Sequence, residues 1–198
     1  LANNNVKAIG IIGTGTQAHM QLEILKNWTN CKNVYVWGRN ETKAQSYKKD
    51  MESKGFNVIT TKDISVLTKH CNLIITTTAS EKPLINYSDI SPGTHITAVG
   101  ADSPNKIELD PEIVARADII AVDSKKQCID HGEIHHAFSR QLIKDNQLVE
   151  IGKIICDMSL GRKNNDQITI ADLTGIAIQD IQIAKAILRS EIITKEYI

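Results

Sequence analysis

The sequence carries no excess charge of either sign, because its 23 Lys and Arg residues balance 23 Asp and Glu over 198 residues. A chain without a basic excess lacks the usual electrostatic basis for binding nucleic acid or an anionic membrane surface. Long hydrophobic stretches are missing as well. Apolar runs such as Leu73–Ile75 are far shorter than the roughly 20 residues that span a bilayer. We therefore expect neither a nucleic-acid partner nor a membrane segment.

Cysteine pairs of the CxxC kind are also absent. The cysteines are scattered along the chain, at Cys31, Cys71, Cys128 and Cys156. Scattered cysteines in a chain of this length favour free thiols in a reducing compartment, with most of them acting as small buried apolar side chains. We therefore expect a cytoplasmic protein without disulfides.

Two signatures of hydrolytic chemistry are missing. The segment 131–136 (HGEIHH) does not match HExxH, because its glutamate does not directly follow the first histidine. Gly132 also makes a continuous helix there less favourable. Neither Ser80 nor Ser159 stands in a nucleophile-elbow sequence. We expect no metal site and no serine hydrolase, and we interpret 131–136 as a polar loop or helix start.

An alternation of strand-like and helix-like segments fills most of the chain. Runs rich in β-branched and apolar residues predict strands at 6–12, 33–37, 57–60, 72–77, 95–99, 119–123 and 166–171. Helical spacing predicts helices at 17–28, 41–54, 64–69 and 111–117. This pattern predicts an α/β fold of the Rossmann type, a doubly wound, mostly parallel sheet with helices on both faces. We expect Trp28 and Trp37 to pack in its core.

The strongest local signal is the turn Gly13-Thr14-Gly15-Thr16-Gln17-Ala18, between the first predicted strand and the first helix. The first glycine permits a tight turn, the second lets a pyrophosphate approach the backbone, and the alanine lets the helix pack on the sheet. The N–H groups at the helix start then face the phosphates. In this setting the turn predicts a dinucleotide site. A plain strand-to-helix turn is the alternative.

The end of the second predicted strand bears on the choice of dinucleotide. It runs Trp37-Gly38-Arg39-Asn40 and has no acid, since Glu41 comes later, on the helix. NAD sites usually place Asp or Glu here, on the ribose 2′-hydroxyl. A guanidinium suits a 2′-phosphate, which it can hold with two hydrogen bonds. We therefore expect NADP(H) rather than NAD(H), with an exposed surface arginine as the alternative role for Arg39.

The chain resembles the ornithine cyclodeaminase/mu-crystallin family in segments that follow one another in the family's order. These are residues 11–18 (IIGTGTQA), 76–79 (TTTA), 98–106 (AVGADSPNK) and 170–175 (IADLTG). Residues 122–124 and 131–134 fit as well, so that the resemblance covers nearly the whole chain. The family includes ornithine and lysine cyclodeaminases, archaeal-type alanine dehydrogenases, ketimine reductases and ectoine-utilisation proteins. The sequence of residues 172–175 (DLTG) is most similar to that of the ectoine-utilisation proteins.

The resemblance implies an NAD(P)-dependent oxidoreductase or cyclodeaminase that moves a hydride between nicotinamide and the Cα of an amino acid or its imine. A mu-crystallin-like protein that binds NADPH and a small ligand without turnover is the alternative. The family's chains are longer, with an N-terminal substrate and dimerisation domain. We therefore expect residues 1–175 to be the dinucleotide-binding domain and 176–198 a helix that packs on that other domain. The full protein is expected to be a homodimer, and this part alone is expected to be inactive.

The opening Leu1–Asn5, without an initiator methionine, fits the same expectation of a part of a longer protein. The resemblance also implies cofactor contacts by position: Thr16 and Gln17 at the pyrophosphate, Thr78 at the nicotinamide ribose, and residues 99–101 beside the nicotinamide ring. The expected cofactor-binding residues are Gly13, Thr14, Gly15, Thr16, Gln17, Arg39, Thr78, Val99, Gly100, Ala101, Lys106, Leu173 and Thr174.

Asp102 is the expected catalytic residue. It follows a strand end and a glycine, where open α/β sheets place their ligands. The resemblance places an acid here, near the substrate amine. A carboxylate can accept the ammonium proton as hydride leaves Cα and then hold the iminium. The alternatives are a simple Asp-Ser-Pro turn for Asp102 and a solvated lysine for Lys106. Asp172, three residues before Gly175, is expected to cap the last helix.

Overall fold

The computed structural model describes the backbone of residues 1–196 and the side chains of residues 1–189. An eight-stranded sheet forms its centre, and every neighbouring pair of its strands is parallel. In spatial order the strands are β3 (Asn57–Thr61), β2 (Asn33–Trp37), β1 (Ile9–Ile12), β4 (Leu73–Thr76), β6 (His95–Ala98), β10 (Thr169–Asp172), β8 (Ile119–Val122) and β9 (Leu148–Glu150). The predicted Rossmann-type α/β fold is confirmed.

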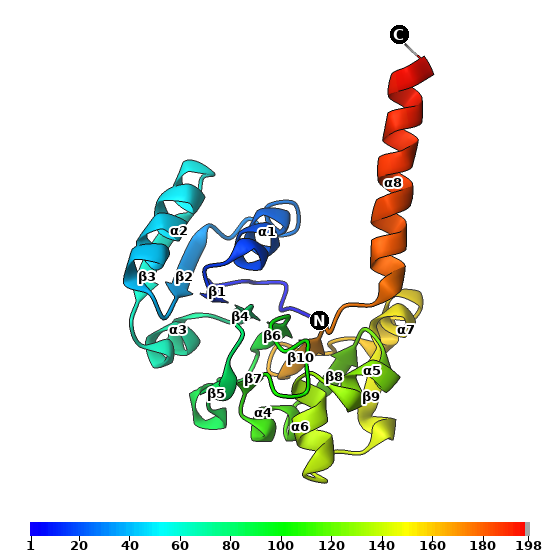
Figure 1. The fold of residues 1–198 in the computed structure, drawn as a ribbon. Coiled ribbons are helices and arrows are strands. Elements are labelled where there is room, and N and C mark those ends of the chain that lie inside the picture. Colours follow the sequence, from blue (N-terminus) through cyan, green and yellow to red (C-terminus); the bar gives the residue numbers. More distant parts are fainter. Residues whose placement is uncertain (197–198) are drawn as a thin grey trace.

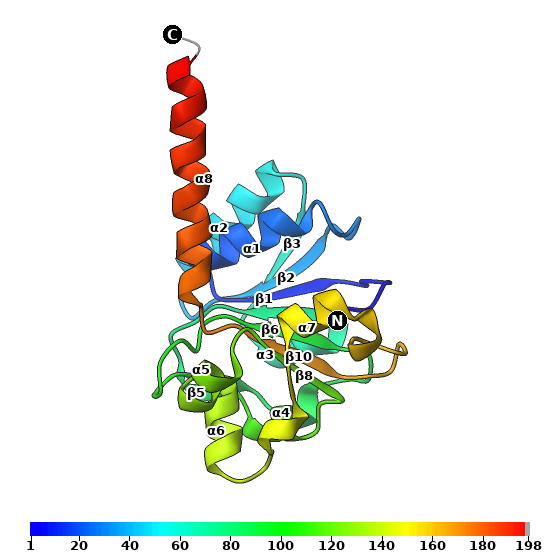
Figure 2. The same cartoon turned by 90° about the vertical axis from the view of Figure 1, so that its right-hand side faces the viewer.

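Helices cover both faces of this sheet (Figures 1 and 2). One face carries α1 (Thr16–Leu25), α2 (Glu41–Ser53) and α7 (Ile151–Cys156). The opposite face carries α3 (Ile64–His70), α4 (Pro111–Ala115), α5 (Lys125–Asp130) and α6 (Glu133–Ser139). Their apolar side chains pack against the sheet in one cluster under α1 and α2, another under α7, and a third under the helices of the opposite face.

The strand β1 shows why both faces need covering. Ile9 and Ile11 pack in the cluster under α1 and α2, whereas Ile12 packs in the cluster under α3 and α4. Successive side chains of a strand point to opposite faces, so a strand that is apolar at every position is buried on both. Its two neighbours, β2 and β4, place it in the interior of the sheet.

Three short strands were not predicted. β5 (Glu81–Ile85) and β7 (Ile107–Leu109) pair with each other in a separate two-stranded parallel sheet, and β9 lies at the edge of the main sheet. The prediction that Trp28 packs in the core is wrong, because 81% of this residue is exposed. Trp37 packs partly buried against the core, and its indole N–H donates to the carbonyl of Lys62 (3.2 Å).

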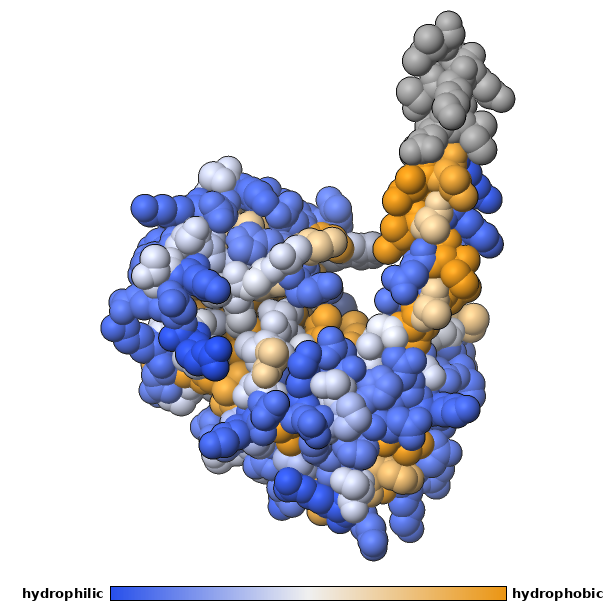
Figure 3. Space-filling model, viewed as in Figure 1, coloured by the Kyte–Doolittle hydropathy of each residue, from blue (hydrophilic) through white to orange (hydrophobic). Residues whose placement is uncertain are grey.

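The helix α8 (Ala177–Glu196) rises away from the rest of the molecule (Figure 1). Large apolar side chains are exposed along it, as Figure 3 shows, among them Ile178, Ile181, Ile183 and Leu188. Among the described residues, no helix is long and apolar enough to cross a membrane.

The cysteines are free thiols, as predicted. Cys71 and Cys128 are buried, whereas Cys31 is half-buried and Cys156 is exposed. Burial raises the pKa of the Cys71 thiol to about 12 and raises that of Cys128 as well. These two thiols therefore act as small apolar side chains.

Candidate functional site

A groove of about 380 Å³ opens where the strands β1, β2 and β4 end. It is lined by residues 13–15, 37–40, 43, 77–80 and 84. The chain crosses from β1 to β2 and β3 on one side and continues through β4 on the other. The groove therefore lies at the switch point of the sheet, where open α/β folds bind their ligands.

The glycine turn forms the floor of this groove. Gly13 has a φ of +119°, and a Cβ there would overlap the hydroxyl of Thr77. Its N–H donates to the carbonyl of Trp37 (2.9 Å), which ties the turn to β2. Gly15 has ordinary extended backbone, and a Cβ on it would have no atom within 4 Å. The space beside Gly15 is therefore open.

The first turn of α1 lies next to that open space. The helix begins at Thr16, directly after Gly15, and no side chain caps its N-terminus. Thr16 and Gln17 are both exposed. Uncapped N–H groups at a helix start attract phosphate oxygens through hydrogen bonds and the helix dipole. The turn has the room and the donors that a pyrophosphate needs.

The end of β2 contributes basic and amide groups to the groove. Arg39 is exposed, and Lys43 joins the lining from the first turn of α2. The Asn40 side chain caps α2 by accepting from the Lys43 N–H (3.0 Å). Glu41 is paired with Lys62 (Oε2–Nζ 2.9 Å) and lines a neighbouring cavity instead. Lys43 was missed by the sequence analysis, although its place in the first turn of the helix predicted at 41–54 could have indicated it.

The expected nicotinamide-side residues leave three adjacent strands at one edge of the sheet. In the register of the sheet, Ala98 of β6 lies between Thr76 of β4 and Asp172 of β10. The Val99 N–H donates to Thr76 (2.9 Å), and the Leu173 N–H donates to Ala98 (2.9 Å). Residues 77–78, 99–101 and 173–174 therefore follow one another across the sheet, next to the groove.

Asp102 and Lys106 form an ion pair in the loop after β6. The Nζ and Oδ1 atoms are 2.6 Å apart, and the Asp102 side chain is 55% exposed. Neither residue belongs to the lining of the groove. The geometry thus presents Asp102 as an accessible carboxylate held by an ammonium group, and the roles expected for both residues stay predictions.

The loop after β10 is held by hydrogen bonds to Asp123. The Thr174 hydroxyl donates to Asp123 Oδ1 (3.2 Å) and accepts from Gln127 Nε2 (3.0 Å). The Gly175 N–H donates to Asp123 Oδ2 (2.8 Å). Because its hydroxyl is engaged in this way, Thr174 offers a positioned backbone and a methyl group to the edge of the site.

Three buried carboxyl groups lie behind these loops, and none of them was expected from the sequence to have a role in the site. The residues are Glu108, Glu133 and Asp172, with at most 1% exposed. Glu108 accepts from the N–H groups of Thr78 (2.5 Å) and Gly100 (3.0 Å). Burial raises its pKa, and those two hydrogen bonds oppose the increase. A glutamate between two apolar residues, in Ile107–Leu109, was the available signal.

Glu133 and Asp172 continue this arrangement. Glu133 accepts from the N–H groups of Glu108 (2.7 Å) and Leu109 (3.0 Å), and burial raises its pKa well above the ordinary range. Asp172 accepts from the Ile134 N–H (3.0 Å) at the start of α6, and burial raises its pKa to about 8. The prediction that Asp172 caps the last helix is wrong, because it caps α6 instead.

The histidines of 131–136 are engaged in local contacts. His135 Nδ1 lies 2.9 Å from the carbonyl of Ile129, and His136 Nε2 lies 2.9 Å from that of Lys106. Within the part of the chain that the structure describes, no group of three or more His, Cys, Asp or Glu side chains is arranged to hold a metal ion.

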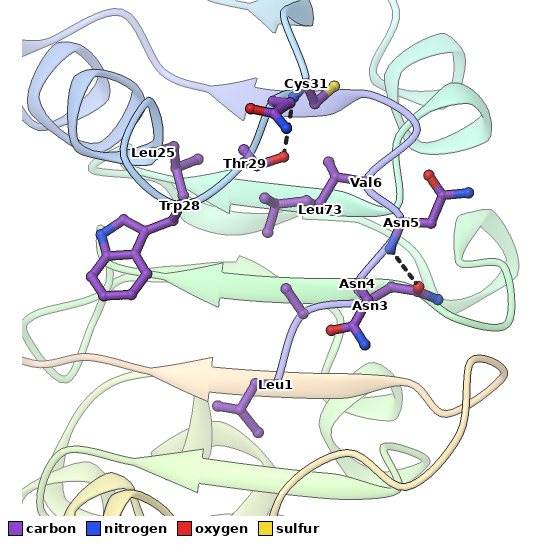
Figure 4. A pocket seen from close by; sticks show the side chains of 12 residues that line it. Leu1, Asn3, Asn4, Asn5, Val6, Leu25, Trp28, Thr29, Cys31 and Leu73 are labelled. Atoms are coloured by element: carbon purple, nitrogen blue, oxygen red, sulfur yellow. Dashed lines mark hydrogen bonds between the residues drawn. The ribbon is translucent and has the colours of Figure 1, made fainter.

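A second cavity, of about 480 Å³, lies near the amino ends of the strands (Figure 4). The carbonyl of Leu1 accepts from the hydroxyl of Thr169, which begins β10, and that of Asn5 accepts from Asn72, which precedes β4. Leu25, Trp28 and the hydroxyl of Thr29 complete the wall. No carboxylate or imidazole lines the cavity.

Solved structures of several enzymes are similar to this chain. An archaeal alanine dehydrogenase dimer with bound NAD is 35% identical, with a TM-score of 0.93 over 98% of this chain and 60% of its own. The iminosuccinate reductase of Paracoccus denitrificans with NAD⁺ is 30% identical, with a TM-score of 0.86 over 96% of this chain and 58% of its own. The Δ¹-pyrroline-2-carboxylate reductase of Thermococcus litoralis with NADH and L-proline is 29% identical, with a TM-score of 0.87 over 93% and 58%.

The comparisons correct the expected cofactor. Each of these structures holds NAD⁺ or NADH, so the preference for NADP(H) over NAD(H) is wrong. The inference rested on the missing acid at the end of β2 and on Arg39. A guanidinium donates hydrogen bonds to a neutral ribose hydroxyl as well as to a phosphate, so its presence does not select NADP.

The chain spans 56–58% of the length of the curated relatives it matches. Among them, the alanine dehydrogenase of Archaeoglobus fulgidus is 37% identical over 188 residues. The sequence profile of one family matches residues 1–194, and that range includes the glycine turn, Asp102 and the loop after β10. On this evidence the chain belongs to the ornithine cyclodeaminase/mu-crystallin family.

Proposed function

We propose that this chain is the dinucleotide-binding part of an NAD(H)-dependent oxidoreductase that acts on an amino acid or its imine. The observation that carries the proposal is the bare glycine turn at the switch point of the sheet. A Cβ on Gly15 would meet no atom, and the first turn of α1 has no side-chain cap. The similar alanine dehydrogenase and reductases, whose structures hold NAD⁺ or NADH, support the choice of cofactor.

Different residues of the groove and its surroundings would bind different parts of the cofactor. Thr14, Gly15, Thr16 and Gln17 would hold the pyrophosphate through backbone N–H groups. Arg39 would donate to the adenosine ribose, and Thr78 would lie at the nicotinamide ribose. Residues 99–101 and 173–174, at the ends of the neighbouring strands, would enclose the nicotinamide side, with Lys106 near it. The bound nicotinamide supplies a carbon that exchanges a hydride with the substrate Cα.

Asp102 is the proposed catalytic residue. In the oxidative direction its carboxylate takes one proton from the substrate ammonium, so that the nitrogen lone pair can form the C=N bond as hydride leaves Cα. The resulting carboxylic acid would pass this proton to water, and the restored carboxylate would then stabilise the iminium by charge. The Lys106 ammonium, 2.6 Å from Oδ1, restrains the carboxylate until the substrate amine replaces it. Water or a distal amine on the substrate completes dehydrogenation or cyclisation.

The exposed side of α8 belongs to the same proposal. Ile178, Ile181 and Ile183 are each about half exposed or more, which is costly for a helix in water. The chain covers only 58–60% of the similar enzymes. We propose that residues 1–175 bind the dinucleotide, whereas the helix from 176 onward packs on the remainder of a longer, homodimeric protein that selects the substrate.

Two measurements on the full-length protein test the proposal. Titration with NADH, followed by nicotinamide fluorescence, should show saturable binding. A screen of amino acids with NAD⁺, and of imines with NADH, should then show turnover at 340 nm. Asp102→Asn should keep NADH binding and lose turnover by roughly a hundredfold or more, which is typical of a lost general base. The matched control is Glu112→Gln, since Glu112 forms an i,i+4 ion pair with Arg116 far from the groove.

The outcomes separate the candidate functions. Failure of the protein to bind NADH contradicts the proposal. Binding of NADH without turnover in the screen would instead favour a mu-crystallin-like role in small-ligand binding. Turnover in Asp102→Asn at the wild-type rate would keep the oxidoreductase and remove Asp102 from its mechanism.

A further inference from the structure

Glu108 connects two loops at the substrate end of the site. It lies in β7 and is fully buried, with 0% of the residue exposed. Oε1 accepts from the Thr78 N–H (2.5 Å), after β4, and Oε2 accepts from the Gly100 N–H (3.0 Å), after β6. One carboxyl group thus holds the backbone of two segments that the proposed function places against the cofactor.

The two loops also touch each other directly. A Cβ on Gly100 would overlap the backbone carbonyl of Thr78 and come within 2.5 Å of Glu108 Oε2. A glycine is therefore needed for this close approach, and the carboxyl group of Glu108 accepts hydrogen bonds from both loops at the point where they meet. Thr78, Gly100 and Glu108 form one packed unit, which we name the loop clamp.

The loop clamp is fixed to the body of the protein from its other side. Glu133, the first residue of α6, accepts from the N–H groups of Glu108 (2.7 Å) and Leu109 (3.0 Å). Both oxygens of Glu133 therefore hold the strand that carries Glu108. A carboxyl group on a strand held in this way cannot follow loop movements, so it restricts them.

We propose that Glu108 is a positioning residue that sets the spacing of the Thr78 and Gly100 loops, and thereby the orientation of the nicotinamide toward the substrate carbon. The inference rests on the proposed function. Glu108 is too deeply buried to touch the cofactor or the substrate, and it acts through the two backbone N–H groups. Small displacements of reacting atoms lower rates strongly, so the effect should appear in hydride transfer and not in overall cofactor affinity.

Glu108→Gln tests this role with a side chain of the same shape. Glutamine offers one acceptor oxygen, and its amide group places a donor against the second N–H. One of the two loops is then released. Arg162→Gln is the matched control at the amino ends of β6 and β10, where the guanidinium donates to the carbonyls of Gln167 (2.5 Å) and Thr94 (3.3 Å). This control also breaks internal hydrogen bonds, but it leaves the loop clamp intact.

The readouts, on the full-length protein, distinguish the two ends of the cofactor. Glu108→Gln should bind ADP within about twofold of wild type, because ADP lacks the nicotinamide ribose and the glycine turn is unchanged. Its enhancement of NADH fluorescence should fall, and single-turnover hydride transfer should slow roughly tenfold to a hundredfold. Arg162→Gln should lower the thermal midpoint and leave both nicotinamide readouts unchanged.

Wild-type fluorescence and hydride transfer in Glu108→Gln would overturn the inference, as would equal losses in both variants. Absence of NADH binding by the wild type would instead mean that the proposed function is wrong. If Glu108→Gln does not fold, amide exchange of the wild-type protein without nucleotide answers the question. The N–H groups of Thr78 and Gly100 should then exchange much more slowly than those of Gly15 and Thr16, and equally fast exchange would overturn the inference.

Discussion

Two regions of the site differ in how their backbone N–H groups are used. In the open end, residues 13–17 after β1, the N–H groups at the start of α1 have no side-chain acceptor. In the held end, the loops after β4, β6 and β10, N–H groups donate to buried or partly buried carboxyl groups. No side chain caps α1 after Gly15, while Glu108 and Asp123 each accept from two backbone N–H groups. A backbone N–H without an acceptor in the protein can donate to a ligand, whereas an N–H that donates to a carboxyl group holds its loop in place. The first end is therefore suited to holding a cofactor and the second to orienting what reacts with it.

The largest effect is expected from a change in the held end, Asp172→Asn. The pKa of Asp172 is raised from 3.8 to about 8 by burial, so the folded protein keeps a proton that the unfolded chain releases. The stability that this bound proton contributes is fully present below about pH 4 and is lost as the pH rises toward about 8. The free energy of unfolding falls over this range by at most about 1.4 kcal/mol per pH unit. The asparagine side chain of the variant has no such proton to lose.

Urea unfolding of both proteins between about pH 5 and pH 8 measures this difference. The free energy of unfolding should decline less with pH in the variant than in the wild type. Asp63→Asn is the control, because Asp63 also caps a helix, α3, but in an exposed position. It should keep the wild-type pH dependence. A wild type that gains stability over the variant as the pH rises would contradict the assignment.

Gly15→Ala should break the open end. The new methyl group would stand where the pyrophosphate approaches the N–H groups of α1, and the loss of about 2 kcal/mol of hydrogen bonding weakens NADH binding roughly 30-fold. Gly152→Ala in α7 is the matched control, since a Cβ at either glycine meets no atom within 4 Å. Both variants should unfold at or above the wild-type temperature. Unchanged NADH affinity in Gly15→Ala would remove the groove as the cofactor site.

Asp123→Asn should weaken the attachment of the loop after β10 and leave dinucleotide binding at the glycine turn unchanged. Asp123 accepts from the N–H groups of Ser124 and Gly175 (2.8 Å each) and from the Thr174 hydroxyl. An asparagine turns one acceptor oxygen into a donor, which costs about 1–2 kcal/mol of stability. Asp157→Asn serves as control, because Asp157 caps a short turn in solvent. ADP-ribose affinity should not change; a tenfold loss would mean that the two ends are coupled.

The open end was largely predictable from the sequence. The apolar run before Gly13 and the GxGxxA spacing are local signals, and between a strand and a helix they favour a dinucleotide site over a plain turn. The parallel sheet follows from the alternation of segments. For the same reason Asp102 could be placed at a strand end before the structure was known.

The held end was not predictable, because its contacts join residues distant in sequence. Glu108 meets Thr78 across 30 positions, and Asp172 meets Ile134 across 38. The apolar neighbours of Glu108 suggest its burial, but they do not indicate which N–H groups it accepts from. The short strands β5 and β7 depend on each other in the same way, and Trp28 gave a misleading apolar signal.

Arg39→Ala should have the smallest effect, and it addresses the one cofactor inference that failed. Arg39 is an exposed part of the groove lining, so the hydrogen bond proposed between it and the cofactor would compete with water. Removing it should weaken NADH binding about fivefold, which corresponds to about 1 kcal/mol. Arg140→Ala, at an exposed arginine after α6, controls for the loss of a positive charge. Calorimetric titration of NADH into each variant measures the difference. Because a guanidinium can serve a ribose hydroxyl, NADH affinity should respond to Arg39; equal affinities in wild type and Arg39→Ala would show that Arg39 is only a surface residue at the rim.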